Sequence, residues 1–275
     1  MESYKLKEYA KKAGADIVGI ANIKRFDELP SEKHPCSIFP EAKSVIVLGR
    51  RITRGALRGV EEGTNFQNYA LYGYDWLDNR FLALTTFTVS EFLEDNGWEA
   101  VPLQNLPPEV PPMGVSVREG SPAPNIMLDF DDAAVRAGAG EIGYCGVFLT
   151  PEFGPRQRFQ IILTDAEIEP DPLSAEPVCL FDKGCRGFCP LGAFEGEKEI
   201  IIAGKKMTGA GIDYRGKCLT CKNGAMPNRY HPAGRPDRLA AVCIRSCADA
   251  LEKSGRIKNR FELPFRMRDA WTVKD

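Results

Sequence analysis

The sequence predicts a mixed α/β or α+β layered domain followed by a small cysteine-rich module. Short β-branched segments alternate with helical patterns up to about residue 165, which is typical of a layered domain. Seven of the nine cysteines lie between residues 179 and 247, and this clustering marks a second region. The 275 residues suffice for one large domain or two modest ones.

The elements of the first region follow from local patterns. Residues 4–14 and 131–137 have helical patterns, and residues 65–95 form a long, largely helical stretch that ends near Gly97. Strands are expected where short β-branched runs are bounded by turn residues, at 16–21, 44–49, 99–103 and 159–165.

Two proline-rich segments interrupt these elements. Residues 104–124 are expected to form a surface loop, and the acidic, proline-rich residues 169–177 to form a domain boundary. The predicted organisation is an α/β domain at 1–170, a cysteine-rich domain at 171–262 and a C-terminal tail at 263–275.

The bulk composition excludes several kinds of partner. With 36 basic and 38 acidic residues, the formal net charge of -2 gives no general attraction to nucleic acid or to an anionic membrane. No apolar run approaches the roughly 20 residues of a membrane span. The N-terminal stretch has neither an apolar signal region nor a twin arginine, so a cytoplasmic protein is expected.

The cysteines indicate a metal centre. Disulfides are rare in the cytoplasm, and clustered cysteines there favour metal binding. Two cysteines, Cys36 and Cys145, are isolated in the sequence. Residues 179–190, CLFDKGCRGFCP, match the C-x2-C-x2-C-x3-C-P run of bacterial ferredoxins, except that Asp182 occupies the second cysteine position.

In two-cluster ferredoxins, the fourth cysteine of such a run binds the other cluster. The spacing therefore predicts a ferredoxin-like module with two iron–sulfur clusters. The predicted ligands are Cys179, Asp182, Cys185 and Cys247 for the first cluster, and Cys189, Cys218, Cys221 and Cys243 for the second.

Asp182 leaves the nuclearity of the first cluster open. As a ligand, its carboxylate would bind one iron of a [4Fe–4S] cluster more loosely than a thiolate does, and that iron would be labile. Alternatively, Asp182 is a solvated loop residue and the first cluster is [3Fe–4S] from the start. A single cluster or zinc is the third interpretation, although zinc prefers closed sets of four ligands.

A glycine-rich turn precedes the cysteines. GAGEIG, residues 138–143, has the spacing of a dinucleotide fingerprint. That fingerprint requires a strand before it and a long helix after it. Here a helical pattern precedes the turn and the strand-like CGVFLT follows it, so the sequence does not favour nucleotide binding.

The longer stretch 137–173, AGAGEIGYCGVFLTPEFGPRQRFQIILTDAEIEPDPL, closely resembles the conserved block of reductive dehalogenases and the related epoxyqueuosine reductases. Those families read roughly AGLGE-x-G, TPEFGPR-x-R and TDLPL-x-PD, followed by the cysteine motifs of two [4Fe–4S] clusters. The upstream segments ADIVGIA, AKSVIVLG and FLEDNGWEAVPLQN are also similar, so the resemblance covers about residues 5–262.

The resemblance implies a nitroreductase-like domain that binds a base-off cobalamin, to which the clusters pass electrons. By position it assigns cofactor contact to Gly138, Gly140, Glu141, Gly143, Phe153, Gly154 and Arg158. It also implies a catalytic tyrosine with Asn105 and Arg156 beside it; Tyr72 and Tyr74 are both in range for the tyrosine, and Tyr74 is preferred. A phenol near a cation is a competent proton donor. Each of these three residues could equally serve in the core or in an ion pair.

Two functions follow as expectations. The first is a cytoplasmic corrinoid-dependent iron–sulfur reductase, an oxidoreductase acting on a small molecule. The alternative is an electron-transfer protein without its own substrate, which serves a corrinoid protein or exchanges electrons with a ferredoxin or flavodoxin. The chain departs from both families, because Asp182 replaces a cluster cysteine and Pro124 aligns with the catalytic aspartate of epoxyqueuosine reductases. No substrate is therefore carried over, and neither DNA, tRNA nor a membrane is expected as a partner.

Overall fold

The computed structural model describes residues 1–181 and 184–271. The chain forms two compact units that interleave along the sequence. Unit 1 comprises Met1–Arg50, Leu77–Ala139 and Arg158–Leu173, and unit 2 comprises Arg51–Trp76, Gly140–Gln157 and the chain from Ser174 onward. The division into residues 1–170, 171–262 and 263–275 stays a prediction.

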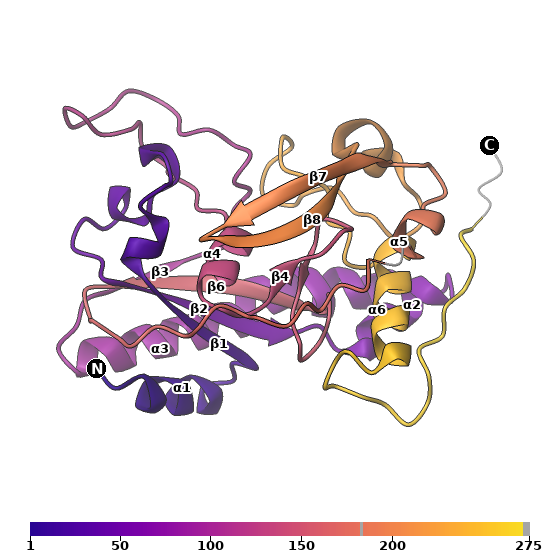
Figure 1. Ribbon diagram of the computed structural model, residues 1–275, viewed down its shortest axis with the longest axis horizontal. Coiled ribbons are helices and arrows are strands. Elements are labelled where there is room, and N and C mark those ends of the chain that lie inside the picture. The colour runs from indigo at the N-terminus through magenta and orange to yellow at the C-terminus, as the bar shows by residue number, and fades with distance from the viewer. Residues whose placement is uncertain (182–183, 272–275) are drawn as a thin grey trace. The chain divides into compact units, whose positions relative to one another are not determined.

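Unit 1 is built on a four-stranded sheet with the order β1–β2–β6–β3 (Figure 1). β1 (Ile17–Asn22) is antiparallel to β2 (Ser44–Arg51), and β3 (Ala100–Leu103) is antiparallel to β6 (Gln157–Thr164). All four strands lie within two residues of the predicted segments. The short, β-branched, turn-bounded runs were therefore a reliable signal.

Two helices cover one face of this sheet. α1 (Ser3–Lys12) and α3 (Ala83–Asp95) lie on the same side of it in Figure 1. Leu6 of α1, Ile46 of β2 and Leu93 of α3 are fully buried and belong to one apolar cluster. Burial of such side chains provides the main favourable free energy of folding for this unit.

The helix α4 (Phe130–Arg136) forms because Asp129 caps it. The Asp129 carboxylate accepts hydrogen bonds from the amides of Asp131 and Asp132 at 3.0 and 3.1 Å. At Gly19 of β1, an added Cβ would lie 2.8 Å from the carbonyl oxygen of Ala137, which follows α4. Glycine is therefore required for this close approach.

The helical stretch expected at 65–95 is only partly α-helical. It forms π-helical segments at Tyr69–Asp75 and Leu77–Leu82 before α3 begins. Gly73 lies against the ring of Tyr69, where an added Cβ would be 2.4 Å from the ring. Such π-helical turns are rare and often occur at functional sites.

The described residues of unit 2 form two hairpins and three α-helices. The hairpins are antiparallel pairs of β4 (Glu141–Ile142) with β5 (Phe148–Leu149), and of β7 (Phe194–Ile202) with β8 (Lys205–Ile212). The helices are α2 (Arg58–Glu61), α5 (Gly184–Gly187) and α6 (Val242–Ser254), with a π-helical turn at Tyr214–Cys218.

The mixed α/β class is confirmed, whereas the nitroreductase-like and ferredoxin-like descriptions stay predictions. No helix within residues 1–181 and 184–271 is long and apolar enough to cross a bilayer. The cytoplasmic location stays a prediction.

Candidate iron–sulfur sites

Eight of the nine cysteines line two cavities in unit 2. Cavity 1 has a volume of about 20 Å³ and is lined by Cys145, Cys179, Cys185 and Cys247, with Tyr144, Leu180, Phe181, Ala250 and Leu251. Cavity 2 has a volume of about 10 Å³ and is lined by Cys189, Cys218, Cys221 and Cys243, with mainly apolar neighbours and Arg238. Each cavity is thus surrounded by four thiols.

Two short segments each supply one cysteine to each cavity. They are α6, and α5 together with the turn that follows it. Cys243 and Cys247 lie four residues apart on α6, which places them on one face with about 6 Å of rise between them. Cys185 lies on α5, and Cys189 lies in the turn after it, where the Cys189 amide donates to the carbonyl of Arg186 at 3.2 Å. Cys189 and Cys247, the last cysteines of their two runs, therefore each line a different cavity from the other cysteines of the same run. Ferredoxin spacing predicts this exchange between the two clusters.

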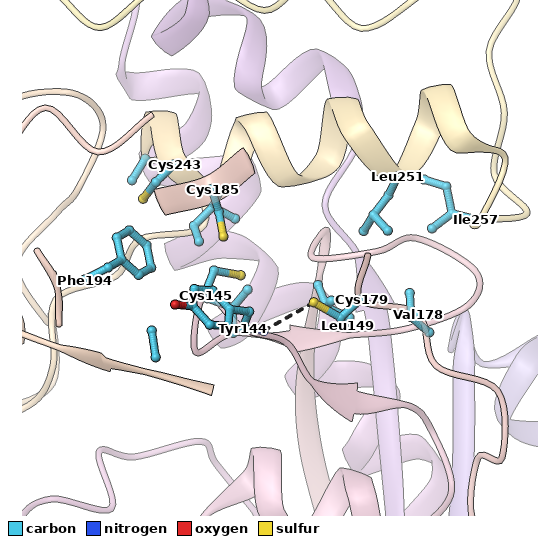
Figure 2. Packing of buried hydrophobic residues seen from close by; sticks show 14 residues of the cluster. Tyr144, Cys145, Leu149, Val178, Cys179, Cys185, Phe194, Cys243, Leu251 and Ile257 are labelled. Carbon is cyan, nitrogen blue, oxygen red and sulfur yellow. Dashed lines mark hydrogen bonds between the residues drawn. The ribbon is translucent and has the colours of Figure 1, made fainter. Parts of the chain in front are cut away.

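Backbone amides point at some of these sulfurs. The Tyr144 amide donates to Cys179 Sγ at 3.4 Å (Figure 2), and the Ala193 amide donates to Cys189 Sγ at 3.2 Å. Burial raises the pKa of Cys179, and the amides of Tyr144 and Phe181 oppose the rise. Burial raises the pKa of Cys243 to about 12. Without a metal this thiol is protonated at neutral pH, so cluster binding must release its proton.

Glu141, predicted to contact a cofactor, holds the segment that carries Cys179. Its Oε1 accepts hydrogen bonds from the amides of Val178 and Cys179 at 2.8 and 2.7 Å. Its Oε2 lies 3.5 Å from Nζ of Lys205, and the carboxylate is buried. Glu141 therefore connects the β4–β5 hairpin to the start of the cysteine motif.

Replacing Glu141 by Ala should loosen cavity 1, because two buried amides would lose a charged acceptor worth about 1.5–3 kcal/mol for each hydrogen bond. We expect iron to leave the loaded variant several-fold faster than wild type under a chelator, as followed by the cluster absorbance. Glu141→Gln keeps an acceptor oxygen and is the matched control. Equal rates of iron loss in the alanine variant and in wild type would contradict this role.

Arg238 places a buried charge beside both cavities. It lines cavity 2, and its Nη2 donates to the carbonyl oxygen of Cys145 at 2.6 Å. Its guanidinium carbon lies 4.9 Å from the centre of the Tyr214 ring. Burial lowers the pKa of Arg238, but Tyr214 and the nearby thiols outweigh burial and raise it, so the group stays charged.

The glycines predicted to contact cobalamin pack against their own chain. An added Cβ would lie 2.1 Å from the carbonyl oxygen of Pro172 at Gly138, and 2.0 Å from that of Leu149 at Gly140. At Gly143 it would lie 2.6 Å from the Leu149 side chain. These glycines allow close approach of backbone segments, which accounts for them without a ligand.

The other predicted contact residues also have partners within their units. The ring of Phe153 lies 5.8 Å from the guanidinium of Arg51, and Gly154 has a left-handed φ of 60°. Nη1 of Arg158 lies 3.7 Å from Oδ2 of Asp78. Cofactor contact by these residues stays a prediction.

The three predicted catalytic residues are placed differently. Tyr74 is buried, and its hydroxyl oxygen accepts a hydrogen bond from the Arg229 amide at 3.2 Å. Asn105 follows β3 in unit 1, whereas Tyr74 and Arg156 belong to unit 2. The grouping of all three into one site stays a prediction.

Arg156 ties three segments of unit 2 together. Its guanidinium donates to the carbonyl of Ile52 at 3.2 Å and to Oδ1 of Asn259 at 3.0 Å, and it lies 3.6 Å from Glu252. Its side chain is only 2% exposed. These contacts give Arg156 a structural role within unit 2.

A larger cavity of about 470 Å³ lies elsewhere in unit 2, within the size range of small-molecule pockets. Its lining is Arg54, Gly55, Leu57, Arg58, Glu61, Phe261, Glu262, Leu263, Phe265 and Arg266. Neither Tyr74 nor Arg156 lines it.

One predicted ligand cannot be placed, and one cysteine was missed. Asp182 lies outside the described residues. Cys145, which is isolated in the sequence, lines cavity 1 with three predicted ligands. The sequence contained a signal for Cys145. The predicted first cluster had only three thiolates, and Cys145 lies in the glycine-rich block directly upstream of the motif.

The donor set of each cavity suits an iron–sulfur cluster. Such a cluster is held by cysteine thiolates, usually four of them. Each cavity is lined by four cysteines among mainly apolar residues.

Comparison with known proteins places these sites in context. No family model matches the chain. A tetrachloroethene reductive dehalogenase of Desulfitobacterium hafniense is 31% identical over 121 residues, which are 43% of this chain and 18% of that protein. The tetrachloroethene reductive dehalogenase of Dehalobacter restrictus is 39% identical over 69 residues, 24% of this chain and 12% of that protein. The matched part of the chain is therefore similar in sequence to reductive dehalogenases.

Solved dehalogenases share the fold. The catabolic reductive dehalogenase NpRdhA aligns with 98% of this chain and 41% of its own, at 16% identity and a TM-score of 0.54. An epoxyqueuosine reductase solved with a tRNA stem loop aligns with 69% of this chain and 52% of its own, at 21% identity and a TM-score of 0.44. The chain thus spans less than half the length of its dehalogenase relatives, and the absence of a tRNA partner stays a prediction.

Proposed function

We propose that the chain is an iron–sulfur reductase in which two clusters pass electrons to a corrinoid for reduction of a small molecule. The observation that supports this most is the arrangement of thiols around two neighbouring cavities in unit 2. The ligands proposed from the sequence and described in the structure are Cys179, Cys185 and Cys247 at cavity 1, and Cys189, Cys218, Cys221 and Cys243 at cavity 2.

The chemistry of the cavities suits low-potential electron transfer. Soft thiolates favour iron–sulfur clusters, and the apolar lining keeps water away from them. Both cavities are lined by residues of α6, so electrons entering one cluster would have a short route to the other. Arg238 supplies a buried positive charge that stabilises the reduced, more negative state of both clusters.

Cobalamin binding is supported by kinship with the dehalogenases. A bound cobalamin would supply a redox-active cobalt that delivers electrons to the substrate. For the protein's own part, Tyr74 is the proposed proton donor, and the Arg229 guanidinium lies 5.8 Å from the centre of its ring. The Arg229 amide holds the Tyr74 hydroxyl in place. Asn105 and Arg156 keep their proposed supporting roles.

The second candidate is an electron-transfer protein that serves a corrinoid protein or another redox partner such as a ferredoxin or flavodoxin. One observation favours it. Gly138, Gly140 and Glu141, which the resemblance assigns to cofactor contact, are engaged in packing and hydrogen bonds within the chain. Such a protein would need the clusters but no corrinoid pocket.

A cobalamin titration separates the two candidates. Anaerobically reconstituted, iron-loaded protein is titrated with hydroxocobalamin, and bound corrinoid is measured by absorbance and equilibrium dialysis. The reductase should bind about one corrinoid per chain with a base-off spectrum, and cobinamide, which lacks the lower base, should compete. Iron-loaded protein that binds no corrinoid would contradict the reductase and leave the electron-transfer protein.

A further inference from the structure

Cys145 lies in the tight turn that joins β4 to β5. The Gly143 amide donates to the carbonyl of Val147 at 2.9 Å, and the Gly146 amide donates to the carbonyl of Gly143 at 2.8 Å. Gly146 has a left-handed φ of 67°, which favours glycine. Arg238 holds the carbonyl oxygen of Cys145. The turn is therefore well fixed, and the direction of the Cys145 side chain is fixed with it.

The Cys145 side chain is directed into cavity 1. It is only 1% exposed, and Cys185 and Cys247 line cavity 1 with it. Figure 2 shows Cys145, Cys179 and Cys185 turned toward the space between α6 and the β4–β5 hairpin.

We propose that Cys145 is the fourth thiolate ligand of the first cluster, so that cavity 1 holds a [4Fe–4S] cluster ligated by Cys145, Cys179, Cys185 and Cys247. This rests on the proposed function only in that cavity 1 holds a cluster. A [4Fe–4S] cluster needs one ligand per iron, and thiolate is its preferred ligand. With Cys145 included, cavity 1 has the same four-thiol complement as cavity 2.

The proposal removes the need for Asp182 as a ligand. It replaces a carboxylate, from which iron would be lost easily, by a thiolate on a rigid hairpin. The first cluster should then be stable with four irons rather than prone to become [3Fe–4S]. It also assigns every cysteine except Cys36, which lies in unit 1.

Two simpler roles for Cys145 are less consistent with its surroundings. All nine cysteines are free, so the structure contains no disulfide at this position. A purely structural thiol would be expected to pack against apolar atoms without a gap, because protein interiors are close-packed. Cys145 belongs to the apolar cluster of unit 2, but it also lines a cavity of about 20 Å³ together with three other cysteines.

Three variants test the proposal. Cys145→Ser, Asp182→Asn and the control Cys36→Ser are reconstituted anaerobically with iron and sulfide, as is wild type. Iron and sulfide per chain are measured, and the oxidised proteins are examined by EPR, in which a three-iron cluster gives a signal and an oxidised four-iron cluster does not. Circular dichroism checks the fold of each variant.

We expect about eight irons per chain and no three-iron signal in wild type, Cys36→Ser and Asp182→Asn. Cys145→Ser should show about seven irons with a strong three-iron signal, or about four irons if the first cluster is lost. Adding Asp182→Cys to Cys145→Ser should restore at least part of the missing iron by returning a thiolate to the ferredoxin position.

Other outcomes would overturn the proposal. A three-iron signal in Asp182→Asn, with Cys145→Ser unchanged, would make Asp182 the ligand. A three-iron cluster in wild type would show that no fourth ligand acts. If Cys145→Ser fails to fold, Asp182→Asn still tests the proposal, because a three-iron signal in that variant would make Asp182 the ligand. Wild type that takes up no iron at all would instead contradict the proposed function.

Discussion

Replacing Arg245 by Met should lower the free energy of unfolding by about 3–5 kcal/mol, because it leaves the buried carboxylate of Glu61 without its partner. Arg245 lies on α6 between Cys243 and Cys247, and it forms an ion pair with Glu61 of α2. The two side chains are 1% and 3% exposed. Burial lowers the pKa of Arg245 to about 10, so its guanidinium is still charged at neutral pH.

The effect should reach the clusters, because α6 supplies a ligand to each cavity. The measurement is anaerobic urea unfolding of the iron-loaded protein, followed by circular dichroism and cluster absorbance. Lys253→Met breaks a pair on the same helix in which the lysine is exposed and Asp249 is largely buried, and it should cost less, about 1 kcal/mol, because water reaches the lysine. The double variant Glu61→Leu, Arg245→Met should recover much of the loss. A cost for Arg245→Met no larger than that for Lys253→Met would contradict the importance of the pair.

Replacing Arg238 by Met should lower the reduction potential of both clusters. A buried positive charge favours the reduced cluster, because reduction adds negative charge in a low-dielectric environment. Its removal should shift the potentials downward, on the order of tens of millivolts, and more for the cluster in cavity 2, which Arg238 lines.

An EPR-monitored redox titration measures these shifts. Arg238→Lys keeps the charge and should shift the potentials less. Arg235→Met is the matched control, because Arg235 is exposed and its guanidinium lies 4.7 Å from the centre of the same Tyr214 ring. Water screens that charge, so its removal should have little effect. Equal shifts in Arg235→Met and Arg238→Met would mean that the buried guanidinium does not tune the clusters.

The sequence predicted the sheet of unit 1 well and the hairpin β7–β8 not at all. Three of the sheet strands, β1, β2 and β6, are apolar and largely buried, as in the 44–49 segment, so their pattern is clear. β7 is exposed along most of its length and includes the charged run EGEKE, so it lacks the apolar alternation that indicates a strand. The two-residue turn Ala203–Gly204, with left-handed φ values of 47° and 81°, was the available signal.

The candidate site shows a similar division. The spacing of the ferredoxin-like run was enough to sort seven cysteines into two sets, because short elements such as α5 and α6 convert spacing directly into position. Cys145 could not be grouped in this way, since 34 positions of chain separate it from Cys179 and only the β4–β5 hairpin brings it to cavity 1. Likewise, nothing local in the sequence indicates that Glu141 bonds the amides of Val178 and Cys179.

The most direct test of the two-cluster account is the iron and acid-labile sulfide content of anaerobically reconstituted protein. The account predicts about eight irons and about eight sulfides per chain. About half of each would mean that only one cavity holds a cluster. Zinc bound without sulfide would contradict the account altogether.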